Sequence, residues 1–295
     1  MSDHSVSAPN LAELQTHRSE KWRGFASDVL PLPVAEMDYP VAQPIRDLLS
    51  EMVAKSDLGY LGAIPELGKG FAHFAGTRWN WEVDPLQVRA ATDVGVAVVE
   101  ILRVFTKPGD SILLSSPVYH NFYNWINETK LNLVDVPFER TGDESANPWE
   151  INWDGIEKAY ASGIKVHILC SPHNPLGRIY SKEELLRLVA LAKRYQVLII
   201  SDEIHAPLTF KGKSFTPMLN LGADAEAVSV TVTAASKGWN IAGLKCAIIV
   251  SQNEAINAHL ATMPMAVHYR ASLLGGCPLL FFFFQAEDGI RDNER

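Results

Sequence analysis

The chain lacks an excess of positive charge. Its 295 residues carry 26 Lys and Arg against 34 Asp and Glu, so the formal net charge is −8. Nucleic acids and anionic membrane surfaces bind clustered Lys and Arg, so we expect neither kind of partner. Hydrophobic residues make up 47% and charged residues 20%, which suits a large core and is unlike a disordered chain. The composition predicts a globular protein with one large domain or two smaller ones.

Cysteine is scarce, and long hydrophobic runs are missing. The chain has three cysteines (Cys170, Cys246 and Cys277), an odd number without the spacing of a disulfide framework, which favours a reducing compartment. The start of the chain contains no apolar segment of the kind found in signal peptides. The apolar run from Leu279 to Phe284 is far shorter than the ~18 residues that span a bilayer. We therefore expect a cytoplasmic protein with no membrane partner.

From residue 92 onward, short runs of apolar and often β-branched residues alternate with helix-like stretches. Such runs are typical of strands buried on both faces, as in a parallel sheet covered by helices. Between two of them, Ser181 and Glu184 form a capping box before an apolar stripe, which predicts a crossover helix. The repeated pattern predicts an α/β fold with three layers around a mostly parallel sheet, and ligands outside the carboxyl ends of its strands. The six runs are residues 111–114, 131–136, 165–170, 197–201, 228–233 and 246–250.

The two ends of the chain differ from this middle part. The first ninety residues are rich in Pro and Trp and contain one helix-like stretch. We interpret residues 1–45 as an N-terminal arm with part of a small domain, and residues 46–275 as the large domain. Residues 276–295, with four consecutive Phe, resemble translated adaptor or misassembled sequence more than a natural domain end. The alternative is a genuine short C-terminus, which would leave an aggregation-prone Phe run exposed.

Polar side chains follow four of the predicted strands where each one ends. Each has an ordinary structural interpretation, since a lone Lys after a strand is usually a solvated surface charge and Asn is a common turn residue. Those interpretations do not predict that the side chains share one edge of the sheet. We therefore predict a functional site there. The residues are Tyr119, Asn174, Asp202, His205 and Lys237.

Three further residues have a spacing loosely like that of a metal site. These are His167, Cys170 and His173. Residues 167 and 170 lie three positions apart on one predicted strand, so their side chains point to opposite faces of the sheet. We therefore expect no metal to be bound by this group.

Three motifs, in this order, resemble a known family. They are SPHNPLGR (171–178), SDEIH (201–205) and SKGWNIAGLK (236–245). The combination resembles the fold type I pyridoxal-phosphate enzymes of the aminotransferase class I/II superfamily. With PLPVAEMDYP (31–40) and SPVYHNFY (116–123), it is similar to the MalY/PatB type of carbon–sulfur lyase, the cystathionine β-lyase type. The resemblance covers residues 20 to 275 and implies a large cofactor domain and an incomplete small α+β domain.

The resemblance implies a role for each residue at the predicted site. Lys237 matches the lysine that binds the aldehyde of pyridoxal 5′-phosphate and then moves the substrate's Cα proton, which requires an amine with a lowered pKa. Asp202 matches the carboxylate that faces the pyridinium nitrogen of the cofactor. Asn174 and His205 match polar groups near the ring's phenolic oxygen, and Tyr119 matches the aromatic side chain stacked on the ring.

The resemblance also implies contacts to the cofactor phosphate. Val94 and Gly95 begin a helix-like stretch, and a helix N-terminus offers free N–H groups to an anion. Thr92 or Asp93 as a plain N-cap predicts the same local structure, so the phosphate role depends mainly on the resemblance. Ser236 and Lys245 match two further phosphate contacts, and Tyr60 matches a tyrosine that reaches the partner subunit's phosphate in dimeric relatives.

The sequence departs from the family at some of these positions. Ala234 stands where relatives often have Ser, and Lys245 stands where many transaminases have Arg. A bidentate contact thereby becomes a point charge, so we expect a lower cofactor affinity. The family's substrate-carboxylate arginine has no counterpart, since Arg270, Arg291 and Arg295 stand in a different context.

The activity implied by the resemblance is β-elimination from a cysteine-type amino acid such as cystathionine. The products are a thiol, pyruvate and ammonia. Transamination is the alternative with the same cofactor, because it uses the same residues. Alternatives of another class are a regulatory pyridoxal-phosphate-binding protein and an inactive truncated chain. We expect a small amino-acid substrate and a homodimer with a shared active site.

Overall fold

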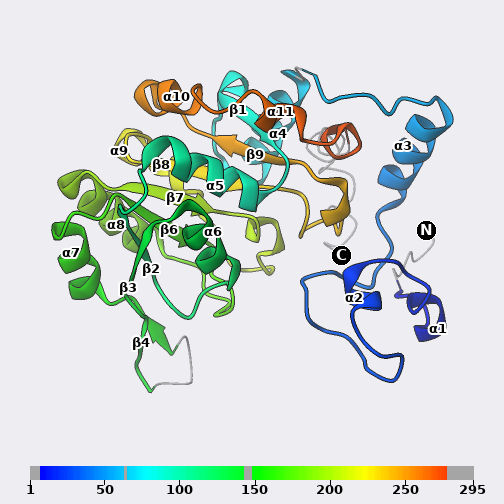
Figure 1. The fold of residues 1–295 in the computed structure, drawn as a ribbon, viewed down its shortest axis with the longest axis horizontal. Helices are drawn as coiled ribbons and strands as arrows, with labels where there is room; N and C mark the ends of the chain where they lie inside the picture. Colours follow the sequence, from blue (N-terminus) through cyan, green and yellow to red (C-terminus); the bar gives the residue numbers. More distant parts are fainter. Residues whose placement is uncertain (1–6, 63–64, 143–147, 278–295) are drawn as a thin grey trace.

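A seven-stranded sheet forms the centre of the protein in the computed structural model, which describes residues 7–62, 65–142 and 148–277 (Figure 1). The strand order is β1-β9-β8-β7-β6-β2-β3. The neighbouring strands from β8 to β3 pair in parallel, and β9 is antiparallel to both β8 and β1. The strands are β1 (Val88–Ala91), β2 (Ser111–Leu114), β3 (Asn132–Asp135), β6 (Val166–Cys170), β7 (Leu198–Asp202), β8 (Ser229–Thr233) and β9 (Ala247–Val250).

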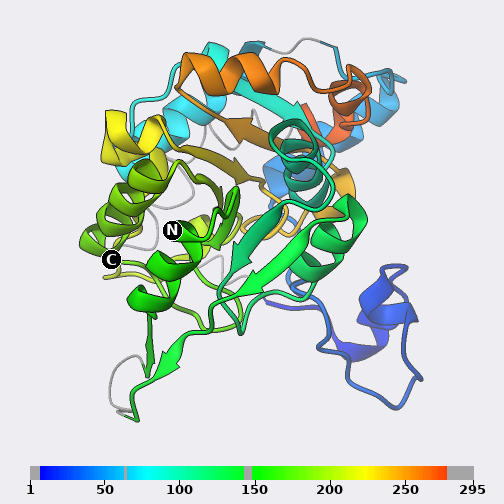
Figure 2. The ribbon, with the colours of Figure 1, turned by 60° about the vertical axis from the view of Figure 1, so that its left-hand side comes forward.

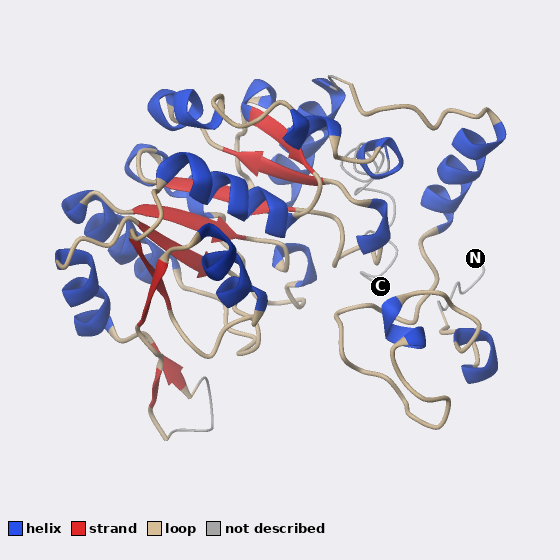
Figure 3. Ribbon diagram, in the orientation of Figure 1, coloured by secondary structure: helices blue, strands red, loops and turns tan. Residues whose placement is uncertain are grey.

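Helices cover both faces of this sheet (Figures 2 and 3). Alternate strand residues point to opposite faces, so Ile168 packs into one core and Leu169 into the other. The predicted three-layer α/β fold is confirmed. One face carries α5 (Val94–Phe105), α6 (Asn121–Thr129) and α10 (Glu254–Leu260), and the other carries α7 (Trp153–Ala161), α8 (Lys182–Tyr195) and α9 (Ala223–Glu226). A third core packs α4 (Pro65–Trp79) against β9.

Helix α8 forms as its sequence predicts. The Ser181 hydroxyl accepts a hydrogen bond from the Glu184 amide at 3.1 Å, and the Glu184 carboxylate accepts one from the Ser181 amide at 2.8 Å. This capping box satisfies N–H groups that the first turn leaves without helical partners. The helix buries Leu185 and Leu188 and ends at Gln196, which adopts a left-handed conformation.

The six predicted strands are present, with two differences from the expectation. Strand β3 is mostly exposed and not buried on both faces, because it lies at the edge of the sheet. Strand β9 runs antiparallel because the chain passes from β8 to its neighbour without a crossover helix. The prediction of a mostly parallel sheet is therefore right, and the expectation of uniform two-sided burial is wrong for β3.

The sequence pattern missed strand β1. This strand has only four residues, and Arg89 interrupts them, so no continuous apolar run marks it. The Arg89 guanidinium donates to the Asn257 amide oxygen at 2.7 Å. Strand β1 pairs with β9, and Ala90 lies opposite Ile248. Because β1 and β8 are both antiparallel to β9, β1 shares the direction of the parallel strands. Its carboxyl end therefore delivers Thr92 to the same edge as the predicted site.

The N-terminal part of the chain lies beside the sheet and not within it (Figure 1). It contains α1 (Leu11–Leu14), α2 (Glu20–Arg23) and α3 (Gln43–Ala54). Two short strands, β4 (Glu139–Arg140) and β5 (Trp149–Glu150), form a separate ribbon, and α11 (Ala266–Tyr269) follows α10. No helix in the described ranges is long and apolar enough to cross a membrane. Of the predicted tail, residues 278–295 lie outside the described residues.

Candidate active site

The carboxyl ends of the parallel strands border a cavity of about 760 Å³. With one exception, the structure brings the predicted site residues together around it. The exception is Tyr60, which is 87% exposed and pairs with Ser272 through an isolated β-bridge. The predicted residues that line the cavity are Val94, Gly95, Tyr119, Asn174, Asp202, His205, Ser236, Lys237 and Lys245.

Asp202 is the most buried acid of this cavity. It ends strand β7 opposite Cys170 of β6, and only 4% of it is exposed. Its Oδ1 accepts a hydrogen bond from the Ile204 amide at 3.1 Å. Burial raises the pKa of the carboxyl to about 7, although the charge of Lys237 acts in the opposite direction. No cation of the described residues lies within ion-pair distance of it, so a ligand with a cationic nitrogen would complement this carboxylate.

Lys237 stands in the turn that follows strand β8. The turn is closed by a hydrogen bond from the Trp239 amide to the Ala235 carbonyl at 3.0 Å. Partial burial lowers the pKa of the Lys237 amine, whereas the carboxylates of Asp202 and Glu36 raise it. The balance is a lowered pKa, which brings the amine closer to the neutral form that acts as a base or nucleophile.

His205 and Asn174 lie at the ends of neighbouring strands. Burial lowers the pKa of His205, and the charge of Lys237 lowers it further, which favours a neutral imidazole. The Asn174 amide N–H donates to the Cys170 sulfur at 3.3 Å. This bond uses only the backbone N–H of Asn174, so its side chain remains available to the cavity that the residue lines.

His173 also shapes the site, although its spacing in the sequence resembled only that of a metal ligand. It is 3% exposed, and its Nε2 donates to the Pro117 carbonyl at 2.9 Å. With that nitrogen protonated, Nδ1 accepts from the Tyr180 hydroxyl at 3.1 Å. Burial lowers the pKa of His173 to about 4, so the imidazole stays neutral and joins the segments that carry Tyr119 and Asn174. Its place directly before Asn174 is the sequence signal that could have identified it.

The first turn of α5 is shaped for close approach. A Cβ atom at Gly95 would lie 3.0 Å from the indole atoms Cζ2 and Nε1 of Trp125, so a larger residue here would have to displace the indole by a few tenths of an ångström. Trp125 also lies 6.3 Å from the ring centre of Tyr119, in an edge-on arrangement. The Tyr119 hydroxyl accepts a hydrogen bond from the Asn121 amide at 2.6 Å. These contacts fix one aromatic wall of the cavity.

Donors for an anion gather where α5 begins. Asp93 is the N-cap and accepts from the Val96 amide at 2.8 Å, as the plain capping interpretation predicts. The other Asp93 oxygen lies 3.2 Å from the Lys245 amine, so an anion would compete with this carboxylate for Lys245. The buried Thr92 hydroxyl has no hydrogen-bond partner among the described residues. A helix N-terminus, a lysine and an unsatisfied hydroxyl together suit a phosphate group.

The N-terminal arm supplies a wall of the cavity that the sequence analysis did not assign. Leu32, Pro33, Val34 and Ala35 line it opposite the sheet residues. These residues belong to the segment PLPVAEMDYP, which contributed to the resemblance but received no role.

The described residues contain no cluster of His, Cys, Asp and Glu that could hold a metal. The His167 imidazole is hydrogen-bonded to the Tyr160 hydroxyl at 2.8 Å.

A family profile described as aminotransferase class I and II matches residues 27–275, which is most of the chain. The chain belongs to this family. One similar member is the cystathionine beta-lyase of Corynebacterium glutamicum, with 36% identity over 251 residues, which are 84% of this chain and 64% of that protein. The chain therefore spans less than two thirds of that relative's length.

Two solved structures of the family agree with the fold. A provisionally named PLP-dependent beta-cystathionase from Corynebacterium diphtheriae has a TM-score of 0.89 and 29% identity, covering 98% of this chain and 74% of that one. Cystalysin from Treponema denticola, which contains pyridoxal 5′-phosphate, has a TM-score of 0.84 and 25% identity, covering 97% and 73%. The fold type I architecture expected from the sequence motifs is confirmed by these likenesses.

Proposed function

We propose that this chain is the cofactor domain of a pyridoxal 5′-phosphate-dependent carbon–sulfur lyase. The observation that carries the proposal is a buried acid, Asp202, which has no ion-pair partner among the described residues and shares one cavity with the amine of Lys237. The cofactor fits this arrangement, because its ring nitrogen is a cation when protonated and its phosphate suits the donors at the start of α5. Residues 46–275 form this domain in our proposal, and residues 276–295 are not native to it.

Each group of the site has a task in this reaction. Bound pyridoxal phosphate supplies an electron-withdrawing ring that stabilises negative charge at the substrate's Cα. Asp202 keeps the ring nitrogen protonated, because loss of that proton would leave a buried carboxylate unpaired. Lys237 would hold the cofactor through its aldehyde. Once the substrate amine has displaced the lysine, its freed Nζ would accept the Cα proton, which its lowered pKa favours. Asn174 and His205 would hydrogen-bond the ring's phenolic oxygen, and Tyr119 would pack against the ring.

The phosphate contacts complete the proposed site. The amides of Val94 and Gly95 at the start of α5 would donate to the phosphate, and Ser236 and Lys245, which line the same cavity, would contact it as well. We propose a homodimer in which Tyr60, exposed in the single chain, reaches the cofactor phosphate of the second subunit. A cytoplasmic location and a small amino-acid substrate are part of the proposal.

Cysteine-type amino acids are the substrates that we propose, with β-elimination as the reaction. Two of the relatives described above, the cystathionine beta-lyase and the beta-cystathionase, carry the names of enzymes that act on cystathionine, which supports this substrate class. Transamination is the second candidate, because the matching family is that of aminotransferases and the same residues would serve both reactions. The two reactions differ in whether a 2-oxo acid must accept the amino group.

The test is to incubate the chain with pyridoxal phosphate and cystathionine without any 2-oxo acid. We expect thiol and pyruvate to appear, and we expect the Lys237→Ala variant to lose both this activity and the visible absorbance of bound cofactor. Strict dependence on a 2-oxo acid would assign the protein to transamination. Bound cofactor without turnover of either kind would indicate a non-catalytic chain, and absence of cofactor binding would refute the proposal.

A further inference from the structure

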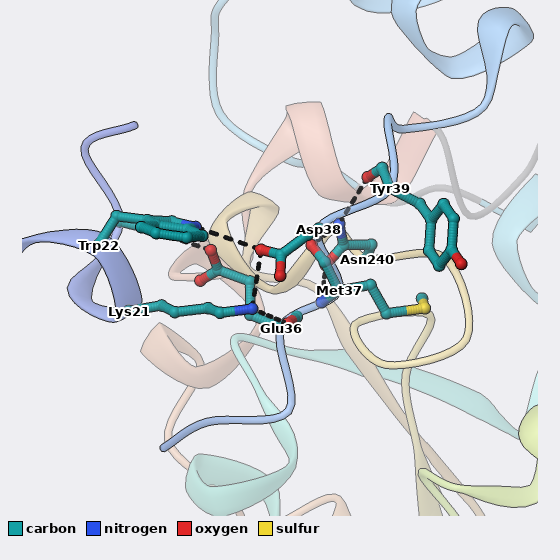
Figure 4. Close-up of polar contacts among 8 residues, drawn as sticks. Lys21, Trp22, Glu36, Met37, Asp38, Tyr39 and Asn240 are labelled. Carbon is teal, nitrogen blue, oxygen red and sulfur yellow. Dashed lines mark hydrogen bonds and ion pairs between the residues drawn. The ribbon is translucent and has the colours of Figure 1, made fainter. Parts of the chain in front are cut away.

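Within the N-terminal arm, residues 32–39 form a strap that borders the active-site cavity, and Figure 4 shows its second half, residues 36–39. The first half, residues 32–35, lines the cavity with apolar side chains. The second half, residues 36–39, makes polar contacts on two sides, with the arm and with the turn that follows Lys237. The position of the cavity wall therefore depends on contacts made just beyond it in the chain.

Asn240 holds the strap on the side of the sheet. Its Oδ1 accepts a hydrogen bond from the Met37 amide at 3.0 Å, and its Nδ2 donates to the Met37 carbonyl at 2.9 Å and to the Tyr39 carbonyl at 3.2 Å. One side chain thus binds three backbone groups of a segment about 200 residues away in the sequence. Both N–H donors of the amide and its oxygen are in use.

Asn240 belongs to the same turn as the reactive lysine. Its backbone N–H donates to the Lys237 carbonyl at 3.4 Å, and its φ is +58°, a left-handed conformation that asparagine tolerates better than most residues. The side chain that binds the strap and the amine that faces the cavity therefore share one short, hydrogen-bonded segment.

The arm holds the other side of the strap. Lys21, which is 3% exposed, donates to the Asp38 carboxylate at 2.7 Å and to the Glu36 carbonyl at 3.0 Å. The Trp22 indole N–H donates to the same Asp38 oxygen at 3.2 Å, and the Ser19 hydroxyl donates to the Glu36 carboxylate at 2.6 Å. Figure 4 shows Lys21 and Trp22 on the side of the strap away from Asn240.

We infer that Asn240 is a positioning residue of the active site, which docks the strap onto the Lys237 turn so that residues 32–35 form a fixed apolar wall for the substrate side chain. The role in turnover rests on the proposed function, but the docking itself does not. An apolar wall suits the alkyl or thioether side chain of a cystathionine-type substrate better than a charged one. The docked strap also keeps the Glu36 carboxylate near the Lys237 amine, whose pKa it raises.

The test compares three variants of the full chain. Asn240→Gly removes the side chain and keeps the positive φ without strain, and Asn240→Asp keeps the acceptor for Met37 but loses both donors. The matched control is Asn80→Gly, because Asn80 also has a positive φ, +49°, and does not line the cavity. Thermal unfolding of all variants checks that each one is folded.

Hydrogen exchange of the strap is the readout that needs no activity. In Asn240→Gly we expect the Met37 amide to exchange at least ~10-fold faster than in the wild type, with a smaller increase in Asn240→Asp. The exchange rates of the β7 and β8 amides should stay unchanged in both Asn240 variants. The exchange rate of the Met37 amide should stay unchanged in the Asn80→Gly control. Unchanged exchange of Met37 in both Asn240 variants would overturn the inference, whatever the chain is found to catalyse.

Two further readouts connect docking to the site. With cofactor bound, we expect Asn240→Gly to raise KM for cystathionine by ~10-fold and to change kcat by less than ~3-fold, because a binding wall is lost. We also expect the pH profile for reaction of Lys237 with pyridoxal phosphate to move to lower pH, as Glu36 moves away while Asp202, Lys245 and His205 still face the amine. Faster exchange with unchanged KM and an unchanged pH profile would show a merely structural role.

Discussion

Replacing Asp202 with asparagine should stabilise the cofactor-free protein above neutral pH and weaken its binding of pyridoxal phosphate. Burial raises the pKa of this carboxyl from 3.8 to about 7. A raised pKa means that the folded protein binds the proton more tightly than the unfolded chain. The stability that this group contributes is therefore present below about pH 4 and is lost as the pH rises toward 7.

The magnitude follows from the same shift. A change of about three pKa units corresponds to roughly 4 kcal/mol of unfolding free energy. Asparagine has nearly the same shape, does not ionise, and can keep the hydrogen bond from the Ile204 amide. The variant should therefore recover up to ~4 kcal/mol at pH 8 and much less at pH 5. Glu203, whose pKa burial raises to about 8, lowers stability at high pH in both proteins and largely cancels in the comparison.

Urea unfolding at pH 5 and pH 8 measures this difference without cofactor. The same proteins, titrated with pyridoxal phosphate at pH 8, should show the opposite order, because only the wild type offers the ring nitrogen a carboxylate. We expect at least ~100-fold weaker cofactor binding by Asp202→Asn, which is about 3 kcal/mol. The reasoning would be refuted if the variant were no more stable than the wild type at pH 8, or if it bound the cofactor equally well.

Three other predictions concern residues that build or line the cavity. His173→Phe should lower the unfolding free energy by roughly 2 kcal/mol in urea titrations, because it leaves buried partners unsatisfied; Tyr180→Phe, the milder control, should cost less. Gly95→Ala should weaken cofactor binding, since its Cβ would meet the Trp125 indole, and the added change Trp125→Ala should restore binding. Lys245→Gln should reduce cofactor affinity by ~10-fold at low salt and less at high salt, and a salt-independent loss would contradict the ionic role.

The sequence predicted the residues at the strand ends because parallel topology constrains them. Once apolar runs identify β6, β7 and β8, their carboxyl ends must share one edge of the sheet, and Asn174, Asp202 and Lys237 follow. Strand β1 was missed because an edge strand of four residues needs no apolar run. Its role could be found only from its pairing with β9.

The strap was missed for a different physical reason. Its docking depends on hydrogen bonds between the Asn240 side chain and backbone groups about 200 residues away, and backbone groups carry no sequence signal. A residue with a positive φ in a turn is usually interpreted through its backbone conformation alone. Asn240 combines both features. Its backbone adopts the left-handed conformation in the turn after Lys237, and its side chain binds the backbone of Met37 and Tyr39.

The two sides of the site, the sheet with Asp202 and the arm with the strap, should respond differently to ligand binding. On the sheet side, burial of Asp202 costs stability at neutral pH until a cationic ligand pairs with it, so cofactor binding and folding free energy are linked. On the arm side, the carboxylate of Glu36 raises the pKa of the Lys237 amine, and our inference is that Asn240 helps to keep the strap, and with it Glu36, in this position. A ligand that pairs with Asp202 should therefore raise the unfolding free energy even in Asn240→Gly, whereas exchange of the Met37 amide should stay fast in that variant with cofactor bound. Full protection of Met37 by the cofactor alone would mean that the ligand, and not Asn240, holds the strap.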